Sequence, residues 1–395
     1  MLNQSQKDLI LSTVPTLKEN GTLLTRYFYE RMLGKEPQLK EVFNIDHQKT
    51  GKQAQALANA VLAYAENIND PSCLMPIIEM ICHKHVSLNI QAPDYNIVGE
   101  HLLCSISEVL QIPLEHELIQ AWKIAYQQLA DIFIQTEQEI YNKTGWLGWR
   151  EFKIVEKVIE SDEITSFYLQ PTDNQPLPNY QAGQYITLRV FVPELGYKQP
   201  RQYSLSDCAG KSYFRISVTK EQPSTEVQGY VSNTLHQLNI NDCVELSAPI
   251  GNFFLADPYK TNVFISGGVG LTPMLAMLNQ LLTNQEYKYD IHFIHATRNA
   301  QVHAMKEELK TLASKHPHLK LYIAYEHPQT TDILGEDYHQ VGYLKLNTDL
   351  VPPQADYYLC GPAPFMQAQH HALVELGINP KQIYSEAFST GGVKL

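Results

Sequence analysis

The spacing of apolar residues changes near residue 150, and this change limits the folds open to the chain. Before it, apolar residues recur at the three- and four-residue spacing of amphipathic helices, as over 118–140, and no alternating strand pattern appears. After Gly145-Trp146-Leu147-Gly148-Trp149, short β-rich runs separated by turn residues follow. From about residue 261, strands and helices alternate. A chain of 395 residues is also too long for one ordinary core, so we expect several domains.

The fold class that these patterns predict is multidomain. An all-α domain over 1–143 and a linker over 144–151 precede an antiparallel β-barrel over 152–257 and a parallel-sheet α/β domain over 258–395. The expected barrel strands are 152–158, 165–169, 184–192, 213–219 and 243–246. The expected parallel strands are 263–266, 291–296, 321–325 and 357–360, with helices over 273–283, 301–314 and 363–376.

Charge and cysteine usage narrow the class of protein. With 30 Lys and Arg against 42 Asp and Glu, the net charge is −12, which argues against a nucleic-acid or anionic-membrane surface. None of the six cysteines forms a CxxC pair, so a zinc site or a disulfide framework is disfavoured. Free thiols and the lack of an export signal lead us to expect a cytoplasmic protein with no obligatory membrane or protein partner. A monomer is compatible with the sequence, which does not fix the oligomeric state.

One histidine on an apolar helix has candidate hydrogen-bond partners elsewhere in the chain. His85 lies in 77–86; a lone histidine there is usually a packed core residue, and spacing favours His83 almost as well. Glu137, however, falls on the inward stripe of the helix over 118–140, where an ionised carboxylate is costly unless it is paired. Glu137 either reaches solvent at the edge of the stripe or accepts a ring N–H of His85 and so supports a metal ligand. Tyr95 would then orient the carboxylate.

A second group has the types that a small-ligand pocket needs. Gln53 and Leu57 are four residues apart, on one helix face, and can supply a polar donor and an apolar lid. Tyr29 can donate a second hydrogen bond, and Phe43 can pack against a flat ring system. Taken singly, each of these residues is more often plain core.

Together these residues resemble the flavohaemoglobin family. Leu24-Thr25-Arg26-Tyr27-Phe28-Tyr29-Glu30-Arg31-Met32 and Tyr95-Asn96-Ile97-Val98-Gly99-Glu100-His101-Leu102-Leu103 are similar to its globin signatures. The resemblance implies haem b with His85 as the proximal iron ligand. It also implies a charge-relay group of His85, Tyr95 and Glu137 and a distal pocket lined by Tyr29 and Gln53.

The string Arg201-Gln202-Tyr203-Ser204 suggests a flavin site. An arginine can hold a pyrophosphate through paired N–H donors, a tyrosine can stack on the flavin ring, and a serine hydroxyl can reach a ring atom. Such a string is common by chance. Between Gly183-Gln184-Tyr185 and Gly229-Tyr230-Val231-Ser232-Asn233, it resembles the FAD-binding barrel of the ferredoxin-reductase superfamily. That resemblance carries Tyr185, Arg201, Gln202, Tyr203 and Ser204 over as FAD contacts.

The glycine-rich turn Gly268-Val269-Gly270-Leu271-Thr272-Pro273 follows an expected strand and opens an expected helix. Its glycines would let the backbone approach a pyrophosphate at the helix N-terminus, with Thr272 as the cap and Pro273 in the first turn. The final proline departs from the common dinucleotide fingerprint but resembles the GxGxxP turn of ferredoxin reductases. Cys360-Gly361-Pro362 resembles their nicotinamide-side segment, although a buried strand-end cysteine before a turn explains it equally.

The C-terminal string Glu386-Ala387-Phe388-Ser389-Thr390 resembles the segment that closes over the flavin. Other family members typically carry Cys in place of Ala387 and Gly-Pro in place of Ser389-Thr390, and the sequence also departs at Ser385, so flavin potential or turnover can differ. Lys84 and Glu386 match positions between haem and flavin, to which we assign a role in tuning electron transfer.

The resemblance implies a nitric oxide dioxygenase that detoxifies NO. NAD(P)H gives a hydride, FAD converts it into single electrons, and haem uses them to turn NO and O2 into nitrate. Two other classes stay open: an O2 or NO carrier or sensor, and a haem, flavin or ferric-iron reductase. A lipid-hydroperoxide reductase would need a roomy apolar distal pocket. Arg298 either meets a ribose phosphate, favouring NADPH, or is a surface charge, so the nucleotide preference stays open.

Overall fold

A computed structural model describes residues 2–222, 224, 228–284 and 286–388. The chain forms two compact units. The first comprises residues 1–149 with 189–201 and 223–231, and the second comprises 150–188, 202–222 and 232–395. Within the described part of the chain, no helix combines the length and the apolar character needed to cross a membrane.

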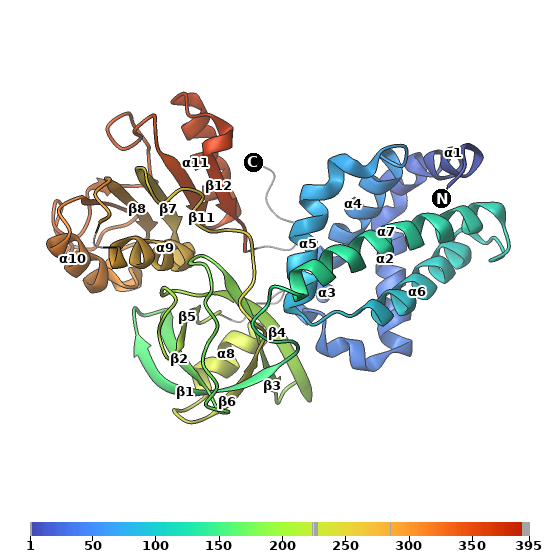
Figure 1. Cartoon of the computed structure of the whole chain (residues 1–395), viewed down its shortest axis with the longest axis horizontal. Coiled ribbons are helices and arrows are strands. Elements are labelled where there is room, and N and C mark those ends of the chain that lie inside the picture. The colour runs from blue at the N-terminus through green and yellow to red at the C-terminus, as the bar shows by residue number, and fades with distance from the viewer. Residues whose placement is uncertain (1, 223, 225–227, 285, 389–395) are drawn as a thin grey trace. The chain divides into compact units, whose positions relative to one another are not determined.

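The first unit is built mainly from helices (Figure 1). Side-chain caps start several of them; Asn3, for example, accepts from the backbone N–H of Gln6 while the Gln6 side chain accepts from Asn3. Their apolar stripes meet in a core that includes Phe28, Met32 and Trp122. The helices are α1 (Gln4–Ser12), α2 (Val14–Lys35), α3 (Ile45–Lys49), α4 (Lys52–Glu66), α5 (Met75–Ser87), α6 (Ala92–Leu110) and α7 (Glu117–Tyr141), with 3-10 turns η1 (Pro37–Glu41) and η2 (Pro71–Leu74).

The β-rich segment forms a curled antiparallel sheet. Its order is β4-β3-β6-β1-β2-β5. The curl brings the residue after β4, Leu205, into a bridge with Ile216 of β5, and the N–H of Ser206 donates to the Arg215 carbonyl at 2.8 Å. The strands are β1 (Arg150–Ile159), β2 (Ile164–Pro171), β3 (Tyr185–Val192), β4 (Tyr197–Ser204), β5 (Phe214–Thr219) and β6 (Cys243–Leu246), and α8 (Tyr230–Gln237) lies between β5 and β6 in sequence.

The C-terminal segment forms a parallel sheet of order β10-β9-β8-β7-β11-β12. The chain steps from β7 outwards to β10 and then returns to β11 on the other side, so the strand order reverses between β7 and β11. The strands are β7 (Asn262–Gly267), β8 (Ile291–Thr297), β9 (Leu319–Tyr325), β10 (Gln340–Val341), β11 (Asp356–Cys360) and β12 (Ile383–Glu386). The helices are α9 (Leu271–Thr283), α10 (Lys306–Lys315) and α11 (Ala363–Glu375), with 3-10 turns η3 (Gly268–Gly270), η4 (Ala300–Val302) and η5 (Pro380–Gln382).

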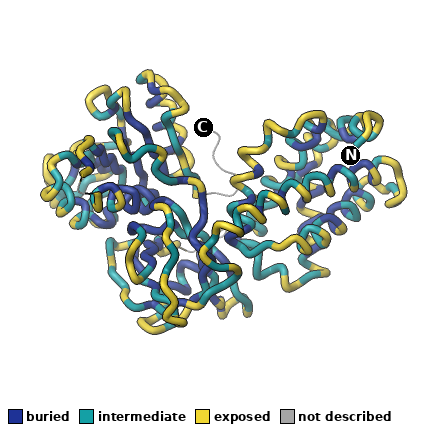
Figure 2. The backbone as a smooth tube through the Cα atoms, in the orientation of Figure 1, coloured by how far each residue is buried: buried dark blue, intermediate teal, exposed yellow. Residues whose placement is uncertain are grey.

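Helices cover both faces of this sheet. Phe264 of β7 packs in one cluster with α9, whereas its neighbours Val263 and Ile265 pack with Met366 and Leu373 of α11. Because successive strand residues point to opposite faces, α9 and α11 lie on opposite sides. β7 and β11 are consequently buried along their whole length (Figure 2).

One expected helix differs from the structure. The prediction over 301–314 is wrong at its start, because α10 begins only at Lys306. The preceding Met305 adopts φ +55°, in the left-handed region that a helix cannot include. Residues 300–302 instead form the 3-10 turn η4.

Candidate active site

His85 lies in the last turn of α5, where it contacts two polar residues from other helices. Its Nδ1–H donates to Glu137 Oε1 of α7 at 2.8 Å, and Nδ1 is 3.0 Å from the Tyr95 hydroxyl of α6. The Tyr95 hydroxyl in turn donates to Glu137 Oε1 at 2.5 Å. The three residues form a closed hydrogen-bonded triangle, as the sequence hypothesis requires.

Glu137 is buried, with 2% of its surface exposed. It therefore does not reach solvent at the edge of the stripe but points inward to His85. A carboxylate in an apolar core is costly unless it is hydrogen-bonded, and Glu137 accepts two hydrogen bonds. It fixes the imidazole with its proton on Nδ1, which leaves the Nε2 lone pair for a metal. Burial, the Glu137 charge and its hydrogen bond raise the Tyr95 pKa, so that hydroxyl remains a donor. This donor set fits haem iron.

His83, the competing histidine, lacks such support. Its Nδ1 is buried, with no hydrogen-bond partner among the described residues. Burial lowers its pKa, which favours the neutral ring.

The four residues predicted for the distal pocket fall into one cluster of α2, η1, α4 and the segments beside them. Tyr29 is 6% exposed, and its ring meets that of Phe43 edge-on with 5.5 Å between centroids. Gln53 lies beside the Tyr29 hydroxyl, and Leu57 packs on the same core one helical turn later. Burial raises the Tyr29 pKa to about 12, which keeps the hydroxyl protonated as a donor.

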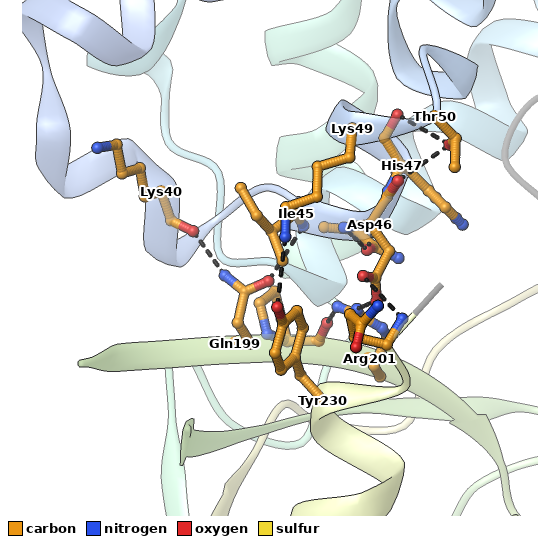
Figure 3. Close-up of polar contacts among 12 residues, drawn as sticks. Lys40, Ile45, Asp46, His47, Lys49, Thr50, Gln199, Arg201 and Tyr230 are labelled. Carbon is orange, nitrogen blue, oxygen red and sulfur yellow. Dashed lines mark hydrogen bonds and ion pairs between the residues drawn. The ribbon is translucent and has the colours of Figure 1, made fainter. Parts of the chain in front are cut away.

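Arg201 lies in β4, in the part of that strand that belongs to the first unit, and it contacts a helix of the globin-like segment. Its Nη2 donates to Asp46 Oδ2 of α3 at 3.0 Å (Figure 3). Asp46 is 2% exposed, and Asn44 caps α3 by accepting from the Asp46 N–H. The nearby Gln199 side chain donates to the Lys40 carbonyl at 2.7 Å and accepts from the Ile45 N–H at 3.1 Å.

The electrostatic surroundings of this cluster are positive. Burial and then the charges of Arg201, Lys84 and Lys52 lower the His47 pKa to about 4. Burial and the Arg201 charge also lower the Lys84 pKa. Arg201, Lys84 and Lys52 thus bring positive charge to this cluster, and the buried Asp46 pairs with Arg201.

The remaining flavin candidates lie in the second unit. The Gln202 side chain donates to the Thr187 hydroxyl at 3.1 Å and therefore acts inside the sheet. Ser204 is 6% exposed, and its Oγ has no hydrogen-bond partner among the described residues. A Cβ on Gly251 would lie 3.0 Å from the Tyr185 ring, so the ring stands against bare backbone. The buried Ser204 hydroxyl without a partner fits a ligand such as FAD. Tyr203, the other predicted contact, lies between Gln202 and Ser204 in β4.

The glycine turn closes against the end of β11. Gly268 adopts φ +54°, and a Cβ on Gly270 would lie 2.5 Å from the Cys360 carbonyl oxygen. Gly361 likewise approaches the Gly267 backbone, and Pro362 caps α11. This bare-backbone cradle at the N-terminus of α9 fits a dinucleotide pyrophosphate.

The predicted capping role of Thr272 is wrong. The turn η3 ends at Gly270, so α9 starts at Leu271 and Thr272 is its second residue. Its hydroxyl donates to the Val269 carbonyl at 3.0 Å instead of accepting from a helix N–H. Pro273 does fall in the first turn.

The C-terminal candidates follow β12, where Glu386 pairs in register with Cys360 of β11. Burial raises the Glu386 pKa to about 8, and its Oε2 has no partner among the described residues. Burial and the Glu386 charge raise the pKa of the Cys360 thiol. Ala387 packs against the core, Phe388 is half exposed, and Ser389 and Thr390 lie outside the described residues.

Sequence reasoning missed Asp46 and Gln199. Each of them bonds a residue more than 150 positions away in the sequence, and neither belongs to a motif. Only the Asn44-Ile45-Asp46 start of a short helix gave a local signal, and that signal concerns capping.

Comparisons with known proteins show the families to which the parts of the chain are similar. Three family models match: "Globin" over residues 26–133, "Oxidoreductase FAD-binding domain" over 151–255 and "Oxidoreductase NAD-binding domain" over 264–371. The flavohemoprotein of Bordetella parapertussis is 50% identical over 404 residues, covering 100% of both chains, and that of Rhizobium meliloti is 46% identical over 98% of both.

Two solved structures extend the comparison. The flavohemoglobin of Malassezia yamatoensis, with bound FAD and heme, has a TM-score of 0.87 at 26% identity and covers 98% of this chain and 100% of its own. The FAD/NAD-binding domain of a nitric oxide dioxygenase from Vibrio cholerae has a TM-score of 0.55 at 34% identity, covering 60% of this chain and 98% of its own. These matches confirm the predicted fold class and the predicted cofactor-binding modules.

Proposed function

Since the chain belongs to the flavohaemoglobin family, in which a globin and a reductase share one polypeptide, we propose that it is a nitric oxide dioxygenase. The family and its domains make the chain a globin–reductase oxidoreductase. The observation that carries the proposal is the His85–Glu137–Tyr95 triangle, on one chain with an FAD-binding and an NAD-binding module.

The cofactors divide the chemistry. Haem would supply O2 binding and one-electron redox chemistry at iron, and FAD would convert a hydride from NAD(P)H into single electrons. One NO, one O2 and one electron balance to one nitrate, so each hydride supports the formation of two nitrates. Because both halves share the chain, electron supply needs no separate protein partner.

The chain's residues have distinct tasks. Glu137 holds the Nδ1 proton of His85 and makes its Nε2 a stronger electron donor, which favours oxygen chemistry over storage. Tyr29, kept protonated by burial, offers its hydroxyl to a ligand in the distal pocket, with Gln53 beside it. Arg201 and the buried Ser204 hydroxyl would hold FAD, and the Gly268–Gly270 turn would hold the nucleotide pyrophosphate.

The test is NO consumption by the full chain loaded with haem and FAD. We expect rapid loss of NO that requires both NAD(P)H and O2, with nitrate as the product. Flavin reduction without haem-dependent NO loss would move the function to the reductase half. Reversible O2 or NO binding without turnover would instead indicate a carrier or a sensor. Lipid-hydroperoxide reduction is checked with the same preparation by replacing NO with a fatty-acid hydroperoxide.

A further inference from the structure

A bound nucleotide would extend along the carboxyl edge of the parallel sheet, from β7 to β9. In an open parallel sheet the ligand lies outside the carboxyl ends of the strands, at the point where strand order reverses. Here that point is between β7 and β11. A pyrophosphate on the turn after β7 would leave the nicotinamide toward Cys360 and the adenosine toward the ends of β8 and β9.

Glu326 stands at this adenosine end. It directly follows β9, and its N–H donates to the carbonyl of Thr297, the last residue of β8, at 2.9 Å. The Glu326 carboxylate raises the pKa of the nearby Tyr343 hydroxyl, and His327 Nε2 lies 3.4 Å from Glu326 Oε1. Any positive charge on His327 is therefore offset by its neighbour.

Three cations near this edge are paired with carboxylates. Arg298, which directly follows β8, forms an ion pair with Glu163. Lys306 and Lys310 of α10 both bind Asp337, at 2.7 and 2.9 Å. Tyr343 is 77% exposed and presents a ring on which a base could stack.

A ribose hydroxyl and a ribose phosphate make opposite demands on such an edge. The 2′-hydroxyl of NADH can donate to a carboxylate, whereas the 2′-phosphate of NADPH needs a cation and is repelled by a carboxylate. Glu326 meets the first demand. Arg298 would meet the second only after leaving Glu163.

We propose that the chain uses NADH in preference to NADPH, with Glu326 as the specificity-determining residue and Glu163 as the residue that withholds Arg298 from a 2′-phosphate. This inference rests on the proposed function only in that the reductase half oxidises a nicotinamide nucleotide. Because the Arg298–Glu163 pair is partly exposed, at 54% and 37%, its contribution is the smaller one.

The experiment is anaerobic reduction of the flavin in the haem- and FAD-loaded full chain by NADH or NADPH, followed by stopped-flow absorbance. We expect kcat/KM to favour NADH by about tenfold or more in the wild type, since one tenfold step needs only about 1.4 kcal/mol of repulsion. Glu326→Gln should raise kcat/KM for NADPH about tenfold and change that for NADH by less than about threefold. Glu163→Gln should raise the NADPH value by a smaller factor.

Glu286→Gln is the matched control, because this exposed acid lies between α9 and β8 at the opposite edge of the sheet, and it should change neither value. Equal use of both nucleotides, or an unchanged preference in Glu326→Gln, would overturn the proposal, as would flavin reduction by neither nucleotide. This assay contains no NO, so its result does not depend on the dioxygenase activity. If NADH reduced the flavin normally and the separate NO assay showed no NO consumption, the dioxygenase would be refuted and this inference would stand.

Discussion

Replacing Glu137 by Gln tests the central contact of the proposed haem site. The change keeps the shape of the side chain and removes the charge that accepts the His85 Nδ1–H bond at 2.8 Å and the Tyr95 bond at 2.5 Å. A hydrogen bond to a charged group contributes about 1.5–3 kcal/mol, against about 0.5–1.5 kcal/mol for a neutral one. Losing that difference for the His85 bond alone corresponds to a roughly tenfold change in a rate or equilibrium constant. Losing it for the Tyr95 bond as well extends the change to about 100-fold.

The assay measures haem dissociation into an excess of a haem-scavenging apoprotein, together with NO consumption at saturating NADH and O2. We expect dissociation to accelerate and NO consumption to fall, each by about 10- to 100-fold. Glu139→Gln is the control, because Glu139 lies on the same helix and is exposed. Flavin reduction by NADH should stay normal in both variants. Wild-type haem retention and NO turnover in Glu137→Gln would refute the assignment of Glu137 as the support of His85.

Three further predictions concern the distal pocket, the glycine turn and the C-terminal acid. Tyr29→Phe, which removes the hydroxyl beside Gln53, should slow NO consumption about tenfold or more and leave flavin reduction unchanged in stopped-flow traces. Gly270→Ala would place a Cβ 2.5 Å from the Cys360 carbonyl oxygen; we expect nucleotide-driven flavin reduction to be lost and the Tm to fall, while haem absorbance is retained. The pKa of Glu386 is raised from 4.5 to about 8, so the stability it contributes is complete below pH 4.5 and is lost as pH rises through about 8. The Tm of Glu386→Gln relative to wild type should therefore increase across that pH range, and a pH-independent difference would contradict this.

The sequence predicted the elements whose pattern is long and regular. The periodicity over 118–140 corresponds to α7, and the buried runs 263–266 and 357–360 correspond to β7 and β11. It did not predict the edge strands β10 and β12, which have two and four residues, because such short strands have no measurable alternation. It also did not predict β4, whose mostly polar sequence around Pro200 lacks an apolar alternation. The start of α10 and the cap of α9 also failed, since a left-handed residue and a 3-10 turn shift those helices by a few positions.

Site residues divide in the same way. Glu137 could be singled out because a carboxylate on an inward stripe conflicts with burial unless it has a partner, and that conflict is visible in sequence. Glu163 and Glu326 show no such conflict, because both are partly exposed acids in polar segments. Their importance depends on which strand ends meet at one edge, and that is a property of topology.

Asp46 illustrates a further limit, and its pairing changes the meaning of Arg201. The motif suggested an arginine whose paired donors face a pyrophosphate, yet one of them, Nη2, donates to a buried carboxylate of α3. A guanidinium has five N–H donors. Beside the Nη2 contact with Asp46, Nη1 donates to the Pro200 carbonyl at 2.8 Å, and the two contacts fix the plane of the group. Removing the acid would leave Arg201 unpaired with Asp46 and near Lys84, whose pKa burial and the Arg201 charge lower. Arg201, the residue predicted to hold FAD, is thus positioned by Asp46 of α3, and flavin affinity should depend on that contact.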